Sequence, residues 1–487
     1  MNFPILSFII WSPIIGVILI WIFTDQERVA KKIAMVSTCI PFLLSIYLVF
    51  NFKVDAGYQF VEEAMWIKDF GVTYFLGIDG LNLSLVFLVS LMTFIVIFTL
   101  NNWSYRYKAF FCCVLVMEAG LLGVFLSLDL ILFYIFWEAV LIPGYFLINI
   151  WGGENRGKAS IKFLIYTMLG SLIMLIAILV IYFKSSLYTF SIPALMSAQF
   201  SPSFERFIFF LLLIGLAIKV PLFPFHSWQP DAYIEAPNPI TVLFSGLLAK
   251  MGVYGFIRVG YSIVPKGGAL FSFVICILAV ITTIYANLCA AVQIDLKRMF
   301  AYSSLGHMGL IMLGIGALNR LGLEGTIFHM FVHGIVAGAI FLTIGMLNEM
   351  MGTIEIKKLR MIVHYIPTGA IILWFWMFAS FGFPGTGAFI AELYILTGAF
   401  QTRAIFGIIA MISIIIMLGY IFSTLPRITF QGDRSKGSTP RSLVYNKKLV
   451  VSLISLAVII IFLGFYPDLL MSRCHNYITL ILGRIQP

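Results

Sequence analysis

A lysine stands inside one of the most apolar stretches of the chain. Lys219 lies between Arg206 and Asp231, which places it about 18 to 20 Å from either charged edge if the segment is helical. That depth is the middle of a bilayer, where an ammonium costs roughly 2.5 to 3.5 kcal/mol on insertion scales. Pro221 and Pro224 then interrupt the helix, and lipid tolerates freed carbonyls only where they face protein or water. We expect Lys219 to belong to an ion path, with a satisfied structural cation as the alternative.

Other ionisable side chains lie well inside apolar segments. Acids and bases that alternate at one depth suggest a row along which protons pass through side chains and intervening water. The structural alternatives are a counter-ion role for Glu138, a protonated hydrogen-bond donor for Glu118 and packing for the histidines. His226, beside the break, fits a relay and a structural role equally well. The candidate proton-carrying residues are Glu138, Lys219, Lys250 and Glu392, with Glu118, His307 and His333 as relay residues.

The sequence offers little for metal or redox chemistry. His329 and His333 are four residues apart on one helical face, a spacing that also suits a metal, but no third or acidic ligand accompanies them. The six cysteines show no C-x-x-C spacing, and no G-x-G-x-x-G, G-x-x-x-x-G-K-[ST] or H-E-x-x-H motif occurs. We therefore expect no cofactor on this chain, no electron transfer and no ATP hydrolysis by the polypeptide alone.

The composition defines the class of protein. Of 487 residues, 61% are hydrophobic and only 11% are charged, which indicates an integral membrane protein of the helical type. The net charge of +10 does not indicate nucleic-acid binding, because the basic residues fall in short connections between apolar runs. Lys and Arg are about twice as frequent in the connections after odd-numbered spans, which predicts that these connections face the cytoplasm or matrix and that both termini lie on the outer, periplasmic side.

We expect an all-α polytopic protein with about fourteen transmembrane helices. Between the second and third spans, apolar and polar residues alternate in 60–66 and 71–76, which predicts a surface hairpin. Farther along, we expect 185–203 to be a loop or an interfacial helix and 431–445 to be a flexible linker. The expected spans are 3–23, 33–51, 81–100, 108–127, 130–149, 161–183, 205–225, 238–262, 270–291, 299–318, 325–348, 365–400 as one broken helix, 403–425 and 448–466.

Two spans contain a break, and this suggests an internal repeat. One break follows Lys219, and the other is the Pro-Gly segment before Glu392. Paired breaks in corresponding positions mark transporters built from inverted repeats. We expect two inverted five-helix repeats, each with a broken helix, at 107–263 and 264–425, preceded by three helices and the hairpin at 1–106 and followed by a linker and the last helix at 426–487.

Three stretches carry a resemblance to a known family. They are 219–237 continuing into 247–255, 295–309, and 382–392. Together with the number of spans, they resemble the antiporter-like membrane subunits of proton-pumping NADH:quinone oxidoreductase, respiratory complex I. Three such subunits are similar to one another. A glutamate in the twelfth span, as Glu392 here, resembles one of the three, whereas lysine is typical of the other two and of related multi-subunit cation/proton antiporters.

The resemblance implies roles and partners. Glu138 and Lys219 would be the central pair, Lys250 the bridging base near His307 and His333, and Glu392 the terminal residue. Flavin, iron-sulfur clusters and quinone would sit on other subunits. The partners would be other membrane subunits, including two homologous antiporter-like chains, in a bacterial inner membrane or a mitochondrial inner membrane. The rival functions are a subunit of a cation/proton antiporter and a purely structural membrane scaffold.

Overall fold

A computed structural model of the protein describes residues 3–54, 56–101, 103, 105–359, 361–430 and 445–485. Most of these residues are helical, and eleven of the described helices are long and apolar enough to cross a membrane. The chain divides into two compact units: unit 1 is Met1–Val220, Leu247–Phe273 and Leu470–Pro487, and unit 2 is Pro221–Gly246 and Val274–Leu469. Apart from Tyr445, the expected linker at 431–445 lies outside the described residues.

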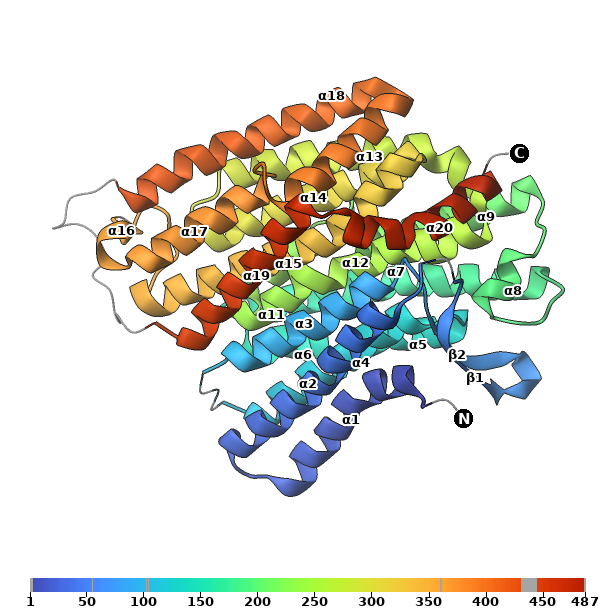
Figure 1. Ribbon diagram of the computed structural model, residues 1–487, viewed down its shortest axis with the longest axis horizontal. Helices are drawn as coiled ribbons and strands as arrows, with labels where there is room; N and C mark the ends of the chain where they lie inside the picture. Colours follow the sequence, from blue (N-terminus) through green and yellow to red (C-terminus); the bar gives the residue numbers. More distant parts are fainter. Residues whose placement is uncertain are drawn as a thin grey trace. The chain divides into compact units, whose positions relative to one another are not determined.

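Unit 1 is a helical bundle with a small β-hairpin. The helices α1, α2, α3 and α4 lie side by side (Figure 1). The elements of this unit are α1 (Ile5–Phe23), α2 (Glu27–Asn51), β1 (Gln59–Ile67), η1 (Lys68–Phe70), β2 (Val72–Ile78), α3 (Leu83–Thr99), α4 (Tyr107–Leu126), α5 (Leu130–Ala139), α6 (Leu141–Trp151), α7 (Arg156–Lys184), α8 (Ile192–Met196), α9 (Pro202–Lys219), α12 (Ala249–Gly255) and η3 (Phe256–Tyr261), the last a π-helical turn.

Unit 2 is built around α15, which packs against α14 and α18. Its elements are α10 (Trp228–Glu235), α11 (Asn238–Leu243), α14 (Leu296–Ala317), α15 (Arg320–Met351), α16 (Ile362–Tyr365), α17 (Pro367–Ser380), α18 (Gly387–Thr429) and α19 (Lys447–Phe465). Three further helical segments have residues in both units: the π-helical turn η2 (Phe244–Leu248), α13 (Pro265–Ala291) and α20 (Asp468–Ile485).

The expected surface hairpin is present. Strands β1 and β2 are antiparallel, with Glu63 opposite Phe75, and the chain turns at Gly71, whose positive φ of 64° suits glycine. The backbone amide of Thr73 in β2 donates to the carboxylate of Asp129, which also caps the start of α5 by accepting from Ile131. The hairpin is thereby tied to the helix that carries Glu138.

The expected spans fall on helical segments, but the count of fourteen is not confirmed and several boundaries differ, two of them at prolines. The span expected at 130–149 is two helices, since Pro143 has no N–H to donate to the carbonyl of Ala139. The span expected at 205–225 already ends at Lys219. The break expected within 365–400 separates α17 from α18, which then continues to Thr429 with non-helical backbone at Arg403.

A buried ion pair joins the hairpin's exit to η3 within unit 1. The guanidinium of Arg258 donates two hydrogen bonds of 2.7 Å to the carboxylate of Asp79 and a third of 2.8 Å to the hydroxyl of Tyr254. The rings of Tyr58, Tyr254 and Tyr477 surround the same cation at 4.7 to 5.8 Å. Such a bidentate, aromatic-lined contact satisfies a guanidinium that has no exposure to solvent.

We predict that Arg258→Met strongly destabilises the protein, because it leaves the buried Asp79 carboxylate without its counter-ion, a change that costs about 3 to 5 kcal/mol. The measurement is the temperature at which the solubilised assembly loses its native elution position. Replacing both partners, as Asp79→Asn with Arg258→Met, should recover part of the loss. The matched control is Arg298→Met, since Arg298 pairs with Asp295 at the surface. Equal melting temperatures for Arg258→Met and Arg298→Met would contradict this account.

Candidate functional site

Lys219 occupies the last position of α9, just before the helix breaks. Val220 caps the helix and the following Pro221 cannot donate a backbone hydrogen bond, so carbonyls of the last turn have no helical donor ahead of them. The negative end of the helix dipole favours a cation at this position. The Lys219 side chain is buried, with 2% of the residue exposed. The break that the prolines predict therefore also supplies a local field that suits an ammonium.

Two neighbouring residues of α5 face this ammonium. Lys219 Nζ lies 5.5 Å from the centre of the Trp137 ring, a distance at which the ring face attracts a cation. Glu138 is the charged group that acts electrostatically on Lys219, yet no direct ion pair joins the two side chains, both of which are described. Glu138 Oε1 is buried and accepts no hydrogen bond from the described residues, while Tyr134, one turn earlier, interacts with the same carboxylate. The two side chains therefore interact electrostatically, but no direct ion pair fixes their positions.

Lys250 lies on a helix that packs against the end of α9. It is fully buried in α12, immediately after the π-helical turn η2. A side chain at Gly252 would meet the backbone nitrogen of Val220 at 2.9 Å, so only glycine allows α12 this close to the last turn of α9. Such π-helical turns are frequent at functional sites. Lys250 and Lys219 therefore belong to the same helix crossing in unit 1.

Glu118 is buried in α4, a helix that contacts both α5 and α12. Neither of its carboxylate oxygens has a hydrogen-bond partner among the described residues. The structural alternative considered for Glu118, a hydrogen bond to a neighbouring helix, is therefore not seen in the described part of the chain. An isolated carboxyl in such surroundings is costly when charged, which favours its neutral form.

A second cluster of ionisable residues forms in unit 2, where α14, α15 and α18 meet. His307 Nδ1 of α14 lies 3.7 Å from Glu392 Oε1 of α18. The rings of His329 and His333, both on α15, have their centres 5.5 and 5.2 Å from that of His307. All four residues are buried. We call these four residues the histidine cluster.

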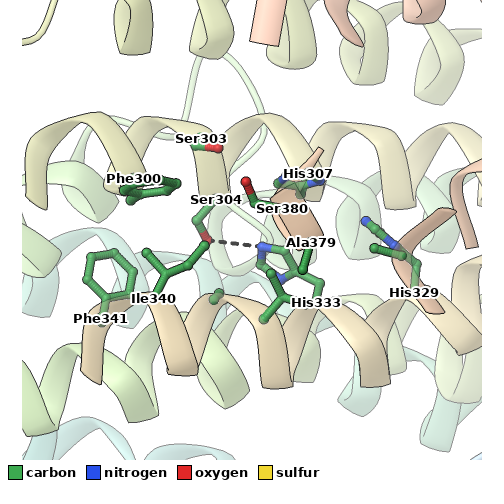
Figure 2. Close-up of a pocket in the computed structure, with 13 residues that line it drawn as sticks. Phe300, Ser303, Ser304, His307, His329, His333, Ile340, Phe341, Ala379 and Ser380 are labelled. Carbon is green, nitrogen blue, oxygen red and sulfur yellow. Dashed lines mark hydrogen bonds between the residues drawn. The ribbon is translucent and has the colours of Figure 1, made fainter. Parts of the chain in front are cut away.

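A small cavity of about 20 Å³ lies beside the histidine cluster, large enough for about one water molecule. The imidazoles of His307, His329 and His333 line it together with Ser303 and Ser304, as Figure 2 shows. Ser304 Oγ is 3.3 Å from His333 Nε2 and orients that ring. Imidazoles and hydroxyls around a water-sized space form a short chain of groups that can both accept and donate a proton.

The second helix break positions Glu392. Between α17 and α18, Gly382 and Gly385 adopt positive φ values of 70° and 92°. A side chain at Gly382 would meet Glu392 Oε2 at 2.5 Å, so glycine is needed for the carboxylate to lie against the broken backbone. Each break in the sequence thus stands beside one of the predicted proton-carrying residues.

Polar side chains extend the cavity wall toward α13. The hydroxyl of Tyr420 in α18 donates to Ser303 Oγ at 2.9 Å and to Asn287 Oδ1 at 3.3 Å. Asn287 in turn donates to Ser413 Oγ at 2.8 Å. These side chains are buried, so the network satisfies polar groups from three helices. Ser303 connects this network to the wall of the cavity that the histidines line.

The predicted residues therefore fall into two sets. In unit 1, Glu138 acts on Lys219, and Lys250 and Glu118 lie on helices that contact α9 or α5. In unit 2, His307, His333 and Glu392 lie together. His226 packs between the rings of Phe223 and Tyr285.

Several residues of these two sets could not be recognised from the sequence. Trp137, Tyr420 and Ser303 carried no recognisable signal. His329 did, as the residue one turn before His333. Among the described residues, donor atoms of His307, His329 and Glu392 lie within 4.8 Å of one another, so His329 has a third and an acidic neighbour that its spacing from His333 does not reveal.

The chain is similar to known proteins over almost its whole length. Residues 127–417 match the sequence profile of a family described as the transmembrane region of NADH:quinone oxidoreductase and Mrp antiporter subunits. The chain is 34% identical over 486 residues to NADH-quinone oxidoreductase subunit M of Rickettsia prowazekii, covering 98% of each chain. It is 36% identical over 470 residues to NADH-ubiquinone oxidoreductase chain 4 of Chondrus crispus, covering 95% of this chain and 94% of that one.

A solved structure shares the architecture. A chain of respiratory complex I from Thermus thermophilus with bound NADH superimposes with a TM-score of 0.88 and 27% identity, covering 98% of this chain and 99% of that one.

Proposed function

The chain belongs to the family of antiporter-like membrane subunits of NADH:quinone oxidoreductase, and we propose that it moves protons through two sets of buried residues, one in each unit. It is a proton-translocating, multi-pass membrane subunit of the respiratory complex and contributes to a redox enzyme whose cofactors are carried by other subunits. The observation that supports the route most strongly is Lys219, a buried cation at a helix break that is coupled to Glu138 without a direct ion pair.

In the proposed cycle, the Lys219 ammonium alternates between two arrangements. In one, Glu138 approaches and stabilises the protonated lysine. In the other, the carboxylate is withdrawn and the proton leaves toward Lys250, because an ammonium without a counter-ion is costly in an apolar interior. Glu118, buried without a hydrogen-bond partner among the described residues, would supply or receive protons on the other side of the pair.

In unit 2, His307, His333 and Glu392 would form a second part of the route. His307 and His333 share a water-sized cavity, and Glu392 lies 3.7 Å from His307, so a proton can pass between them with small side-chain movements. Glu392 then exchanges the proton as the terminal residue. The two helix breaks, after Lys219 and before Glu392, support two inverted five-helix repeats at 107–263 and 264–425.

The finer assignments follow the same proposal. Flavin, iron-sulfur clusters and quinone would lie on other subunits, and two homologous antiporter-like chains would be among the membrane partners. A bacterial inner membrane suits the relatives named subunit M, with a mitochondrial inner membrane as the alternative. Both termini would face the outer side. The rival antiporter function is less favoured, because the relatives reported above are named for the quinone reductase and the twelfth-span residue is a glutamate.

Glu138→Gln tests the central pair. The substitution keeps the shape of the side chain but removes the charge that acts on Lys219, so we expect normal assembly and a reduction of proton pumping by roughly tenfold or more. The measurement is NADH-driven proton uptake by inverted membrane vesicles, with assembly checked on a native gel. The control is Glu154→Gln, which neutralises an exposed carboxylate of the same chain. Near-normal pumping by Glu138→Gln would contradict a role in proton transfer and would favour a structural role for Glu138, as in the scaffold hypothesis.

A series at Glu392 tests the terminal residue. Glu392→Asp should retain much of the pumping because the carboxyl remains, whereas Glu392→Gln should lose most of it, by roughly tenfold. Glu392→Lys should keep part of the activity, because a base serves at this position in the sister subunits, although a cation facing His307 limits the rescue. Proton uptake per electron pair is the measurement, and Glu349→Gln, an exposed change in α15, is the control. Full pumping by an assembled Glu392→Gln complex would refute the role of Glu392.

A further inference from the structure

The histidine cluster contains more metal-binding groups than a proton relay requires. Donor atoms of His307, His329 and Glu392, one from each of three helices, lie within 4.8 Å of one another, and all three residues are buried. His307, His329 and His333 all line the same small cavity, and Figure 2 shows their imidazoles near one another. His329 belongs to this set, although the proposed proton route does not need it.

We propose that His307, His329 and Glu392 form a binding site for a divalent transition-metal ion, Zn²⁺ in particular, and that an ion bound there blocks proton transfer through unit 2. The donor set of two imidazoles and one carboxylate is one that Zn²⁺ accepts readily, whereas Mg²⁺ and Ca²⁺ prefer oxygen ligands alone.

The geometry is close to that of a zinc site. Zn²⁺ is held at about 2.0 to 2.2 Å by imidazole nitrogen and carboxylate oxygen, so two ligand atoms of a tetrahedral site lie roughly 3.3 to 3.5 Å apart. His307 Nδ1 and Glu392 Oε1 are already 3.7 Å apart. All three donor atoms lie within 4.8 Å of one another, so side-chain movements of at most about 1.5 Å bring them to the tetrahedral spacing. The adjoining cavity of about 20 Å³ has room for a water as the fourth ligand.

Charge also favours a metal ion over a cluster of protonated imidazoles. Three buried imidazoles cannot all be protonated at these distances without strong mutual repulsion, whereas one dication is shared by neutral imidazoles and offset by the Glu392 carboxylate. Binding requires the nitrogens and the carboxylate to be free of protons, so the ion competes directly with the protons that these groups would carry. Inhibition rests on the proposed proton route, whereas binding itself does not.

The experiment compares zinc bound to the isolated, fully assembled complex. The complex is prepared with the parent chain, with His329→Gln and with His364→Gln, equilibrated with ZnCl₂ and freed of loosely held ion before zinc is counted by mass spectrometry. His364 is an exposed histidine of α16, so its replacement is the matched control. We expect His329→Gln to bind one zinc ion fewer per complex, while His364→Gln binds as many as the parent. Zinc ions bound to other subunits contribute equally to all three preparations, so they do not affect the difference.

Inhibition is measured separately from binding. Zinc should inhibit NADH-driven proton uptake in the parent, and the inhibitory concentration should rise at least about tenfold in His329→Gln, since losing even an outer-shell partner of a metal ligand costs 10- to 100-fold in affinity. Loss of the bound ion without loss of inhibition would refute the blocking role and leave the binding site standing. An unchanged zinc count in His329→Gln would overturn the site.

A cryo-electron microscopy map of the parent complex with added zinc keeps the proposal testable if His329→Gln fails to assemble. Density bridging His307, His329 and Glu392 is expected. A map in which these side chains are well defined and no density joins them would overturn the proposal, whatever the outcome of the pumping measurements.

Discussion

The cost of holding ions in an apolar interior governs this structure, and its two clearest cases lie in the same unit. Arg258 and Lys219 are both buried cations. Arg258 donates two short hydrogen bonds to Asp79 and is surrounded by three tyrosine rings. Lys219 has a ring at 5.5 Å and a carboxylate that acts from beyond contact distance. The first arrangement stabilises one state, and the second leaves the ammonium able to exchange its partner and its proton.

The helix breaks serve the same requirement. A continuous helix satisfies its own backbone and offers nothing to a side chain, whereas an interrupted helix presents carbonyls or amides and a dipole end within the membrane. Lys219 stands at the carbonyl end of α9, where a cation is favoured. Glu392 lies against the backbone of Gly382 in the second break. Proline and glycine therefore interrupt the helices beside Lys219 and Glu392, and both side chains are buried.

Much of this architecture could be predicted from residue type and spacing. Hydropathy indicated the helices, proline and glycine indicated the two breaks, and alternation indicated the hairpin, because each of these signals is local in the chain. What could not be predicted depends on distant residues. Asp79 and Arg258 are 179 positions apart, and nothing local pairs them. His329 and His333 alone are an incomplete metal site, and Glu392, far along the sequence, lies near His329 because α18 packs against α15. Pro143 is a local signal for the break at Val140 between α5 and α6, but 130–149 is almost entirely apolar, so hydropathy alone predicts one span.

The proposed proton route depends on the ammonium of Lys219. The most direct measurement is the number of protons taken up per NADH oxidised by inverted vesicles containing Lys219→Met, which preserves the length and apolar bulk of the side chain while removing the ion. Lys184→Met, a change at the end of α7, provides the reference. The account predicts that the Lys219→Met complex assembles, retains its flavin and iron-sulfur absorbance, and pumps protons at roughly a tenth of the reference rate or less. An assembled Lys219→Met complex with the reference proton-to-electron ratio and rate would contradict it.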